Sequence, residues 1–247
     1  MTAPDPATGR HLIDRTPVRH SATFLHHSVE FRICPGTELP RAAVAHGLRE
    51  AVDRLRTVEA AFDGQAPQAE LRAAVIAAVM ATCRRVRDAT SGYFDPWAMP
   101  GGFDPAGLLT GWALERAATA LSDAGFTDFA ISASDELLVR GTAADGKPWR
   151  VGIRHPSDGI SLAMIDTAVS TSTGPVIDPR TQQRARHWAA VTVLGPNLGI
   201  ADAYATALRA AGPAGLVWFP TADGYRTVLL TEPRPTDEPA LDLASAA

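Results

Sequence analysis

Cysteine is scarce in this chain of 247 residues, and its two cysteines form no metal-binding or redox motif. Cys34 and Cys83 lie too far apart for a C-x-x-C pair or a zinc-ligand spacing. Cys83 falls on an apolar helical face, where we expect a small buried side chain. The cysteine usage therefore excludes a zinc or disulfide framework and fits a reducing compartment.

Long apolar runs and an excess of basic charge are also missing. No stretch approaches the roughly 20 apolar residues that span a membrane, and residues 1–10 contain neither a signal-peptide core nor a cysteine for lipid attachment. The net charge is -4, with 23 basic residues dispersed along the chain, so no basic patch for DNA or RNA is expected. We therefore expect a cytoplasmic protein that binds neither a membrane nor nucleic acid.

The motifs of common nucleotide-binding and hydrolytic enzymes do not occur either. The sequence has no Gly-x-x-x-x-Gly-Lys phosphate loop, no Gly-x-Gly-x-x-Gly after a strand, no Gly-x-Ser-x-Gly elbow and no His-Glu-x-x-His. A conventional nucleotide-binding fold or hydrolase is therefore disfavoured.

The arrangement of apolar residues predicts an α+β fold. Helical spacing predicts amphipathic helices over 39–58 and 70–86, a third from Asp104–Pro105 to a stop at Gly125, and a fourth after Gly199. Short β-type runs are predicted at 129–132, 137–140, 149–153, 168–172, 190–194 and 227–230. Because helices and strands are segregated, we expect a mainly antiparallel sheet with packed amphipathic helices.

The length is sufficient for one large domain with a well-buried core. We expect this single domain to cover residues 21–231. Both ends are polar and contain prolines, which predicts a disordered leader over 1–20 and a flexible tail over 232–247.

Two residues near the C-terminal end are candidates for binding a cation. Asp202 and Thr206 lie four residues apart on a predicted helix, which places a carboxylate and a hydroxyl on one face, one turn apart. Both oxygens can bind a hard cation such as Mg²⁺. Alternatively, Asp202 is an acid that the helix dipole favours near an N-terminus, and Thr206 bonds back to a backbone carbonyl.

A series of segments in fixed order gives this pair its context. They are SGYFDP (91–96), FDPAGLLTGWA (103–113), PWRVGIRHP (148–156), AVSTS (168–172), VIDPRT (176–181) and the helix with Asp202 and Thr206. Together they resemble the ApbE family, the FAD:protein FMN transferases, and in particular its short actinobacterial-type members. The resemblance covers about residues 91–230 and implies an ApbE-like (T-fold-like) architecture, in agreement with the α+β prediction.

The resemblance also implies a set of binding residues. The implied ligands of Mg²⁺ are the side chains of Asp202 and Thr206 and the backbone carbonyls of Gly107 and Ala205. The residues implied to bind FAD are Asp104, Gly107, Thr110, Asp135, Ser170, Thr171, Ser172 and Asp178. For several of these an ordinary structural role is the alternative: Asp135 and Asp178 as turn residues, and 170–172 as a hydroxyl-rich strand edge.

Three positions depart from the pattern of the family. Thr110 stands where the family has a lysine, so a neutral hydroxyl replaces a charge near the pyrophosphate. Pro175 stands where the family has a histidine, and proline can transfer no proton. Ala133-Ser134-Asp135 replaces a Gly-Gly-Asp turn, which removes the permissive glycine backbone.

No catalytic residue is therefore assigned from the sequence. His26, His27, His155 and His187 are candidates for the missing histidine on composition alone.

The resemblance implies a Mg²⁺-dependent transferase that cleaves FAD and attaches FMN to a Thr or Ser of an acceptor flavoprotein. The alternative is a catalytically impaired family member that binds flavin or another nucleotide as an accessory protein, because the lysine and histidine positions differ. A scaffold that binds no flavin is a third hypothesis.

Overall fold

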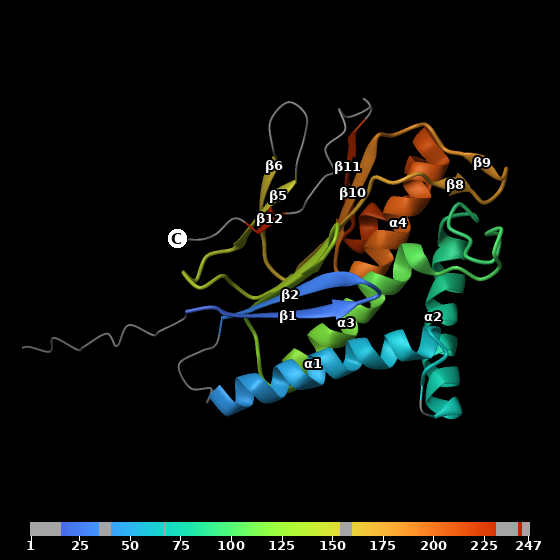
Figure 1. Cartoon of the computed structure of the whole chain (residues 1–247). Coiled ribbons are helices and arrows are strands. Elements are labelled where there is room, and N and C mark those ends of the chain that lie inside the picture. Colours follow the sequence, from blue (N-terminus) through green and yellow to red (C-terminus); the bar gives the residue numbers. More distant parts are fainter. Residues whose placement is uncertain (1–15, 35–40, 67, 154–159, 231–241, 244–247) are drawn as a thin grey trace, which may run out of the picture.

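The computed structural model describes residues 16–34, 41–66, 68–153, 160–230 and 242–243. Over this part of the chain, helices cover one face of a large antiparallel sheet and a small antiparallel sheet lies on the other side (Figure 1). The large sheet, in spatial order, contains β1 (Val18–Phe24), β2 (His27–Ile33), β3 (Phe129–Ala133), β4 (Glu136–Arg140), β7 (Thr167–Ser172), β10 (Ala190–Gly195) and β11 (Arg226–Leu230). The small sheet contains β12 (Asp242–Leu243), β5 (Trp149–Ile153) and β6 (Ile160–Met164), and β8 (Ile177–Asp178) pairs with β9 (Gln183–Arg184).

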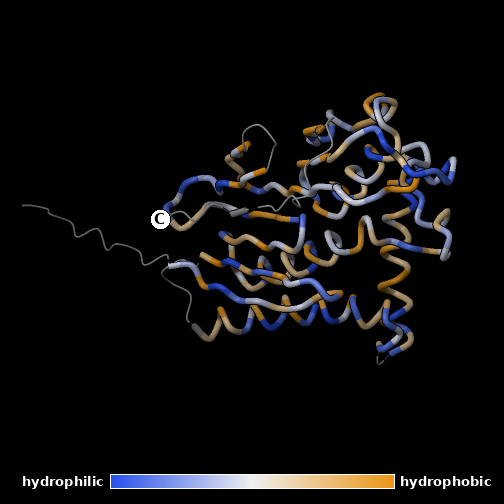
Figure 2. The backbone as a smooth tube through the Cα atoms, turned by 45° about the horizontal axis from the view of Figure 1, so that its top comes forward, coloured by the Kyte–Doolittle hydropathy of each residue, from blue (hydrophilic) through white to orange (hydrophobic). Residues whose placement is uncertain are grey.

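The α-helices of the described residues differ in what they pack against. They are α1 (Arg41–Phe62), α2 (Ala69–Ala89), α3 (Ala106–Asp123) and α4 (Leu198–Ala211), and the short 3₁₀ segments 212–217 and 221–223 follow α4. Helices α1, α3 and α4 contact the large sheet, whereas α2 packs against the other helices. Hydrophilic and hydrophobic positions alternate along α1 (Figure 2), as expected for a helix with one buried face.

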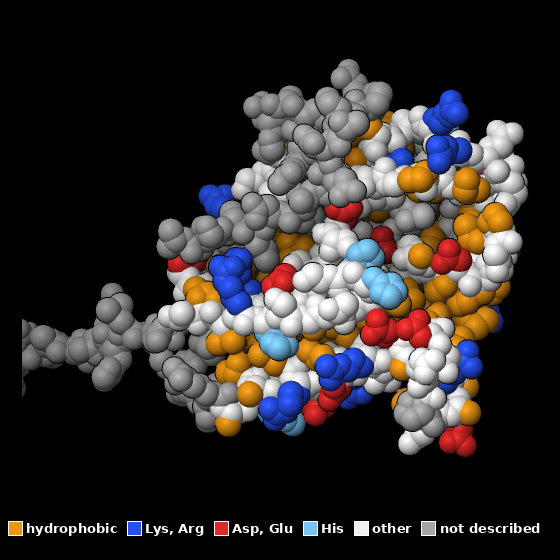
Figure 3. Space-filling model, in the orientation of Figure 1, with side chains coloured by type: hydrophobic (Ala, Val, Ile, Leu, Met, Phe, Trp, Pro, Cys, Tyr) orange, Lys and Arg blue, Asp and Glu red, His pale blue; other side chains and the backbone are white. Residues whose placement is uncertain are grey.

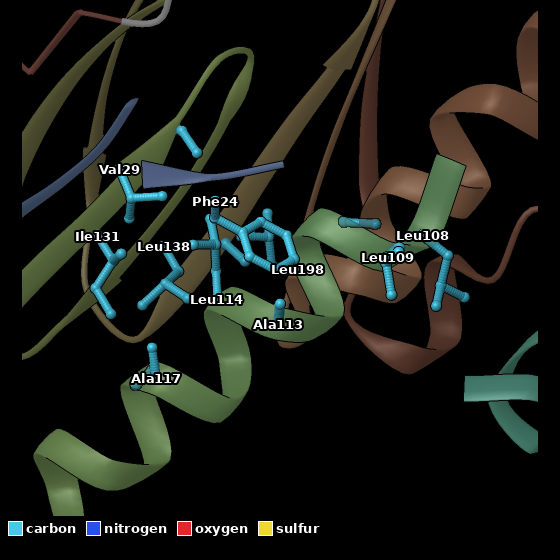
Figure 4. Packing of buried hydrophobic residues seen from close by; sticks show 14 of the residues in the cluster. Phe24, Val29, Leu108, Leu109, Ala113, Leu114, Ala117, Ile131, Leu138 and Leu198 are labelled. Carbon is cyan, nitrogen blue, oxygen red and sulfur yellow. The ribbon is translucent and has the colours of Figure 1, made fainter. Parts of the chain in front are cut away.

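Both faces of the large sheet are buried near its centre. Leu138 of β4 faces the helices and packs in the same cluster as Leu114 and Ala117 of α3 (Figure 4). Its neighbours Leu137 and Val139 point the other way, into a second cluster that the small sheet closes. Successive side chains of a strand point to opposite faces, so β4 reads as an apolar run rather than as an alternating strand.

Helices α3 and α4 approach closely because glycine occupies both sides of their crossing. A Cβ atom added at Gly111 of α3 would lie 2.8 Å from the Cα and N of Gly199 in α4. These are backbone atoms that cannot rotate away, so the two helices can pack this closely only without side chains at these positions. The crossing determines how the N-terminal turns of α3 face α4.

The α+β fold with a mainly antiparallel sheet is confirmed, and all four predicted helices are present. The predicted strands match β3, β4, β5, β7, β10 and β11, whereas β1, β2, β6, β8, β9 and β12 were not predicted. Strand β1 begins at Val18, inside the segment expected to be a leader, and β12 lies inside the expected tail and pairs with β5. The remainder of both terminal segments lies outside the described residues, apart from 16–17. None of the described helices is long and apolar enough to cross a membrane.

Candidate functional site

A polar cavity of about 260 Å³ lies where the start of α3, the β3–β4 turn, the end of β7 and α4 meet. Its wall contains the predicted cofactor-binding residues Thr110, Asp135, Ser170, Thr171 and Ser172 and the predicted metal ligand Asp202. Pockets for drug-sized ligands measure roughly 300–1,000 Å³, so this cavity has room for part of a dinucleotide. In the part of the chain that the structure describes, no Lys or Arg lines it.

A larger cavity, of about 630 Å³, lies between β6 and the β10–β11 strands. None of the predicted site residues lines it. We therefore take the smaller cavity as the candidate site, because predicted site residues line its wall.

Histidine and acidic side chains also gather around the β1–β2 turn, on the face visible in Figure 3.

Helix α4 carries the predicted cation-binding pair. Asp202 and Thr206 both lie in α4, which confirms the helical spacing of this pair. Asp202 is 8% exposed, and its Oδ1 accepts a hydrogen bond of 3.0 Å from the Ser170 hydroxyl of β7. The carboxylate is thus held at the cavity wall by a strand that is distant in sequence.

The third predicted ligand, Gly107, lies against Thr206. A Cβ atom added at Gly107 would lie 3.0 Å from Thr206 Oγ1. Gly107 also has non-helical angles (φ -75, ψ 22) inside α3. The fourth predicted ligand, Ala205, is buried in α4 beside Thr206.

These residues suit a hard cation, although they form no conventional metal cluster. Among the residues that are described, no three His, Cys, Asp or Glu side chains come together as a metal site. The predicted set instead combines a carboxylate with hydroxyl and carbonyl oxygens, which Mg²⁺ accepts as ligands. The acidic side chains at the cavity, with no Lys or Arg in its described wall, also favour a cation.

A second buried carboxyl group, Glu136, was not predicted. Glu136 is 8% exposed, lines the cavity and pairs directly across the sheet with Ser170. Burial raises the pKa of Glu136 well above its usual range, and the neighbouring carboxylate of Asp202 raises it further. Burial also raises the pKa of Asp202, to about 7, although the hydrogen bond from Ser170 opposes this shift. One sequence signal was present: the glutamate lies two residues before Leu138, on the same face of a strand.

Among the described residues, His27 is the histidine that lines the cavity. It lies at the start of β2, and its Nδ1 is 3.0 Å from the Ser134 hydroxyl in the β3–β4 turn. Ser134 has a φ of 49, so a serine adopts the left-handed conformation here, which costs of order 1–3 kcal/mol. The loss of the glycine therefore does not prevent this turn from forming.

The other candidate histidines that the structure describes do not line the cavity. His26 is an exposed turn residue with a φ of 67, and the ring of His187 packs against Gly212. His155 lies outside the described residues.

Two predicted cofactor-binding residues stabilise turns outside the cavity wall. Asp104 is exposed, and its Oδ1 accepts a hydrogen bond of 2.9 Å from Ala106 N at the start of α3. Asp178 accepts hydrogen bonds from Arg180 N (2.9 Å) and the Thr181 hydroxyl (3.1 Å). The contacts of Asp178 match its structural alternative as a turn residue.

The N-terminus of α4 is held by a residue of α3. Glu115 Oε1 accepts a hydrogen bond of 2.7 Å from Leu198 N, and its Oε2 lies 2.9 Å from Arg140 Nη2. Asn197 caps the same helix through a hydrogen bond of 3.0 Å from Ile200 N. These contacts fix the position of Asp202, about one turn further along α4.

Comparison with known proteins identifies relatives of this chain. The model of the ApbE family matches residues 101–228. A FAD:protein FMN transferase of Klebsiella pneumoniae (strain 342) is 32% identical over 122 residues, which cover 42% of this chain and 35% of that protein. The Escherichia coli (strain K12) FAD:protein FMN transferase is 28% identical over 141 residues, which cover 49% of this chain and 40% of that protein. The match thus spans well under half the length of these relatives.

Solved structures show the same fold over nearly the whole chain. The flavin transferase ApbE from Vibrio cholerae, H257G mutant, superposes with a TM-score of 0.74 at 16% identity and covers 93% of this chain and 98% of that one. The flavinyl transferase ApbE from Pseudomonas stutzeri, apo form, superposes with a TM-score of 0.72 at 18% identity. The superposition covers 92% of this chain and 94% of that one.

Proposed function

Since this chain belongs to the ApbE family, we propose that it binds FAD together with a divalent cation and transfers FMN to a hydroxyl group of an acceptor protein. The proposal rests on the residues that line the cavity. The cavity wall combines a buried carboxylate, Asp202, with hydroxyl groups of β7 inside the segment that the family model matches.

The residues present support a cation in this role. Asp202 and Thr206, with the carbonyls of Gly107 and Ala205, would hold the ion. A bound divalent cation neutralises the diphosphate and makes a phosphate a better leaving group. Without it, the acidic wall would repel the diphosphate, because no Lys or Arg of the described residues lines the cavity.

The proposed transfer needs an acceptor hydroxyl and a base. The hydroxyl oxygen forms a bond to the FMN-side phosphorus, the bond from that phosphorus to the bridging oxygen breaks, and AMP leaves with that oxygen. The hydroxyl proton passes to a base at the cavity. His27 is positioned for this role, since it lines the cavity and Ser134 orients its ring.

One experiment tests the cation and the flavin together. Calorimetric titration with FAD should show tighter binding with Mg²⁺ than without it, and Asp202→Ala should remove the difference. Asp53→Ala, an exposed acid of α1, is the control and should behave as the unmodified protein. Equal FAD affinity of the unmodified protein with and without Mg²⁺ would refute the cation site.

The second candidate function is that of an impaired, flavin-binding accessory protein. It is favoured by Thr110, which lines the cavity where the family has a lysine, and by Pro175 in place of the histidine. The mass of an acceptor peptide of the type Asp-x-x-(Ser/Thr)-Gly-Ala-Thr, incubated with protein, FAD and Mg²⁺, separates the two functions. A mass increase equal to FMN less one water supports the transferase, and FAD binding without such an increase supports the accessory protein.

A further inference from the structure

Glu136 shares a face of the large sheet with Ser170. The two residues are direct partners between β4 and β7, so their Cβ atoms lie about 4.5–5.5 Å apart on one side of the sheet. Two residues further along each strand, Leu138 and Ala168 both pack in the helix-side core. Glu136 therefore faces α4, as Ser170 does when it donates to Asp202.

One oxygen of the Glu136 carboxyl group receives no hydrogen bond from the described residues. Its Oε2 is buried and accepts no hydrogen bond within the described part of the chain, and the carboxyl group of Asp202 lies within hydrogen-bonding reach of Glu136. A buried carboxylate without a partner costs several kcal/mol unless a proton or a cation neutralises it. Glu136 lines the same cavity as Asp202, so one cation at this wall would neutralise both groups.

We propose that Glu136 is a second carboxylate ligand of the divalent cation, beside Asp202. The inference rests on the proposed function for the presence of a cation, but it adds a ligand that the family pattern does not supply. Together with the Thr206 hydroxyl and the backbone carbonyls assigned to the ion above, two carboxylates would make an all-oxygen set that suits Mg²⁺ or Mn²⁺. Because two carboxylates match the charge of such an ion, the protein binds it before any nucleotide is present.

The competing role for Glu136 is purely structural. In that case its carboxyl group keeps a proton, shares it with Asp202, and contacts no cation. Both roles explain the burial of Glu136, so the test must measure the binding of a cation directly.

Binding of Mn²⁺ without FAD, followed through the electron paramagnetic resonance signal of free Mn²⁺, separates the two roles. We expect the unmodified protein to bind Mn²⁺, and Glu136→Gln to weaken the affinity roughly tenfold or more, since the loss even of a supporting group around a metal costs about 10–100-fold. Asp202→Asn should show a loss of similar size. Glu50→Gln, on the exposed face of α1, is the matched control and should bind as the unmodified protein does.

Thermal unfolding provides a measurement that does not depend on the Gln variant alone. Mn²⁺ should raise the melting temperature of the unmodified protein, because a ligand that binds only the folded state stabilises it. The increase should shrink in Glu136→Gln and in Glu136→Leu, whose apolar side chain continues the run of Leu137 and Leu138. Folded variants that bind Mn²⁺ as tightly as the unmodified protein would overturn the proposal in favour of the protonated pair.

Failure of the inference and failure of the proposed function give different results. An unmodified protein that binds no Mn²⁺, with or without FAD, overturns the inference and removes the cation from the proposed function. Mn²⁺ binding that depends on Glu136, in a protein that binds no FAD, supports the inference while the flavin assignment fails. FAD binding that requires Mn²⁺ but is unchanged in Glu136→Gln overturns the inference and leaves the proposed function in place.

Discussion

The substitution Gly111→Ala tests whether the close crossing of α3 and α4 positions the site. The added methyl group would lie 2.8 Å from the Cα and N of Gly199 and 2.9 Å from the carbonyl carbon of Leu198. Comfortable contacts between carbon atoms are about 3.5–4.0 Å, so the helices must move apart by roughly 1 Å. All three neighbours are backbone atoms, so rotation of a side chain cannot relieve the contact.

Two opposing terms determine the size of the effect. Overpacking of a well-packed core costs typically 1–3 kcal/mol. Replacing a glycine inside a helix by alanine stabilises the helix by about 0.5–1 kcal/mol. The free energy of unfolding should therefore fall by about 1–2 kcal/mol, which corresponds to a melting temperature lower by about 2–8 °C for a chain of this size.

Urea unfolding followed by far-ultraviolet circular dichroism measures this change, provided the slope against urea stays constant. Gly101→Ala is the control, because no heavy atom lies within 4 Å of its added Cβ, and it should leave the unfolding free energy unchanged or slightly raise it. Gly111→Ala should also weaken Mn²⁺ binding in the folded protein, since separated helices move Gly107 away from Thr206. A Gly111→Ala protein as stable as the unmodified one would show that the helices do not cross at these glycines.

Three further changes have expected outcomes. Thr110→Lys should tighten FAD binding in calorimetry at low ionic strength, and this gain in affinity should shrink as salt screens the added charge. An unchanged affinity at low salt would show that residue 110 does not face the phosphates. Glu115→Ala should lower the urea unfolding free energy by about 2–3 kcal/mol, because its half-buried carboxylate accepts two hydrogen bonds, whereas Asp53→Ala removes an exposed pair and should cost less than about 1 kcal/mol. Burial raises the pKa of the Cys83 thiol to about 12, so in a Cys34→Ala variant a disulfide reagent at pH 8 should react only after unfolding; rapid reaction of the native protein would contradict this burial.

Local patterns account for the elements that could be predicted. Helices α1 and α2 were predicted because apolar residues recur every three to four positions, and their bounds, Arg41–Phe62 and Ala69–Ala89, agree with the predictions to within a few residues at each end. Strand β1 was missed because most of its side chains are exposed, as expected for a strand at the edge of a sheet. Strand β2 carried a signal that was overlooked, since Val29, Phe31 and Ile33 alternate with polar residues.

The helical half of the site follows from sequence alone. Any helix over 198–211 places Asp202 and Thr206 on one face, because the period of the helix decides it. The same holds for Cys83, whose position in the apolar pattern of α2 predicted its burial, and the side chain is 0% exposed. These are properties of neighbouring residues, and neighbouring residues share a helix without any help from the remainder of the fold.

Only the tertiary structure decided which strand side chains join that helix. Glu136 meets Ser170 because of the register between β4 and β7, and a shift of one residue would turn Glu136 to the opposite face of the sheet. His27 meets Ser134 across more than a hundred residues, through the pairing of β2 with β3. No local pattern encodes such register, because it is set by how the whole sheet buries its two faces. The sequence by itself therefore determined the carboxylate–hydroxyl pair of α4, and the sheet determined the second carboxylate and the histidine beside it.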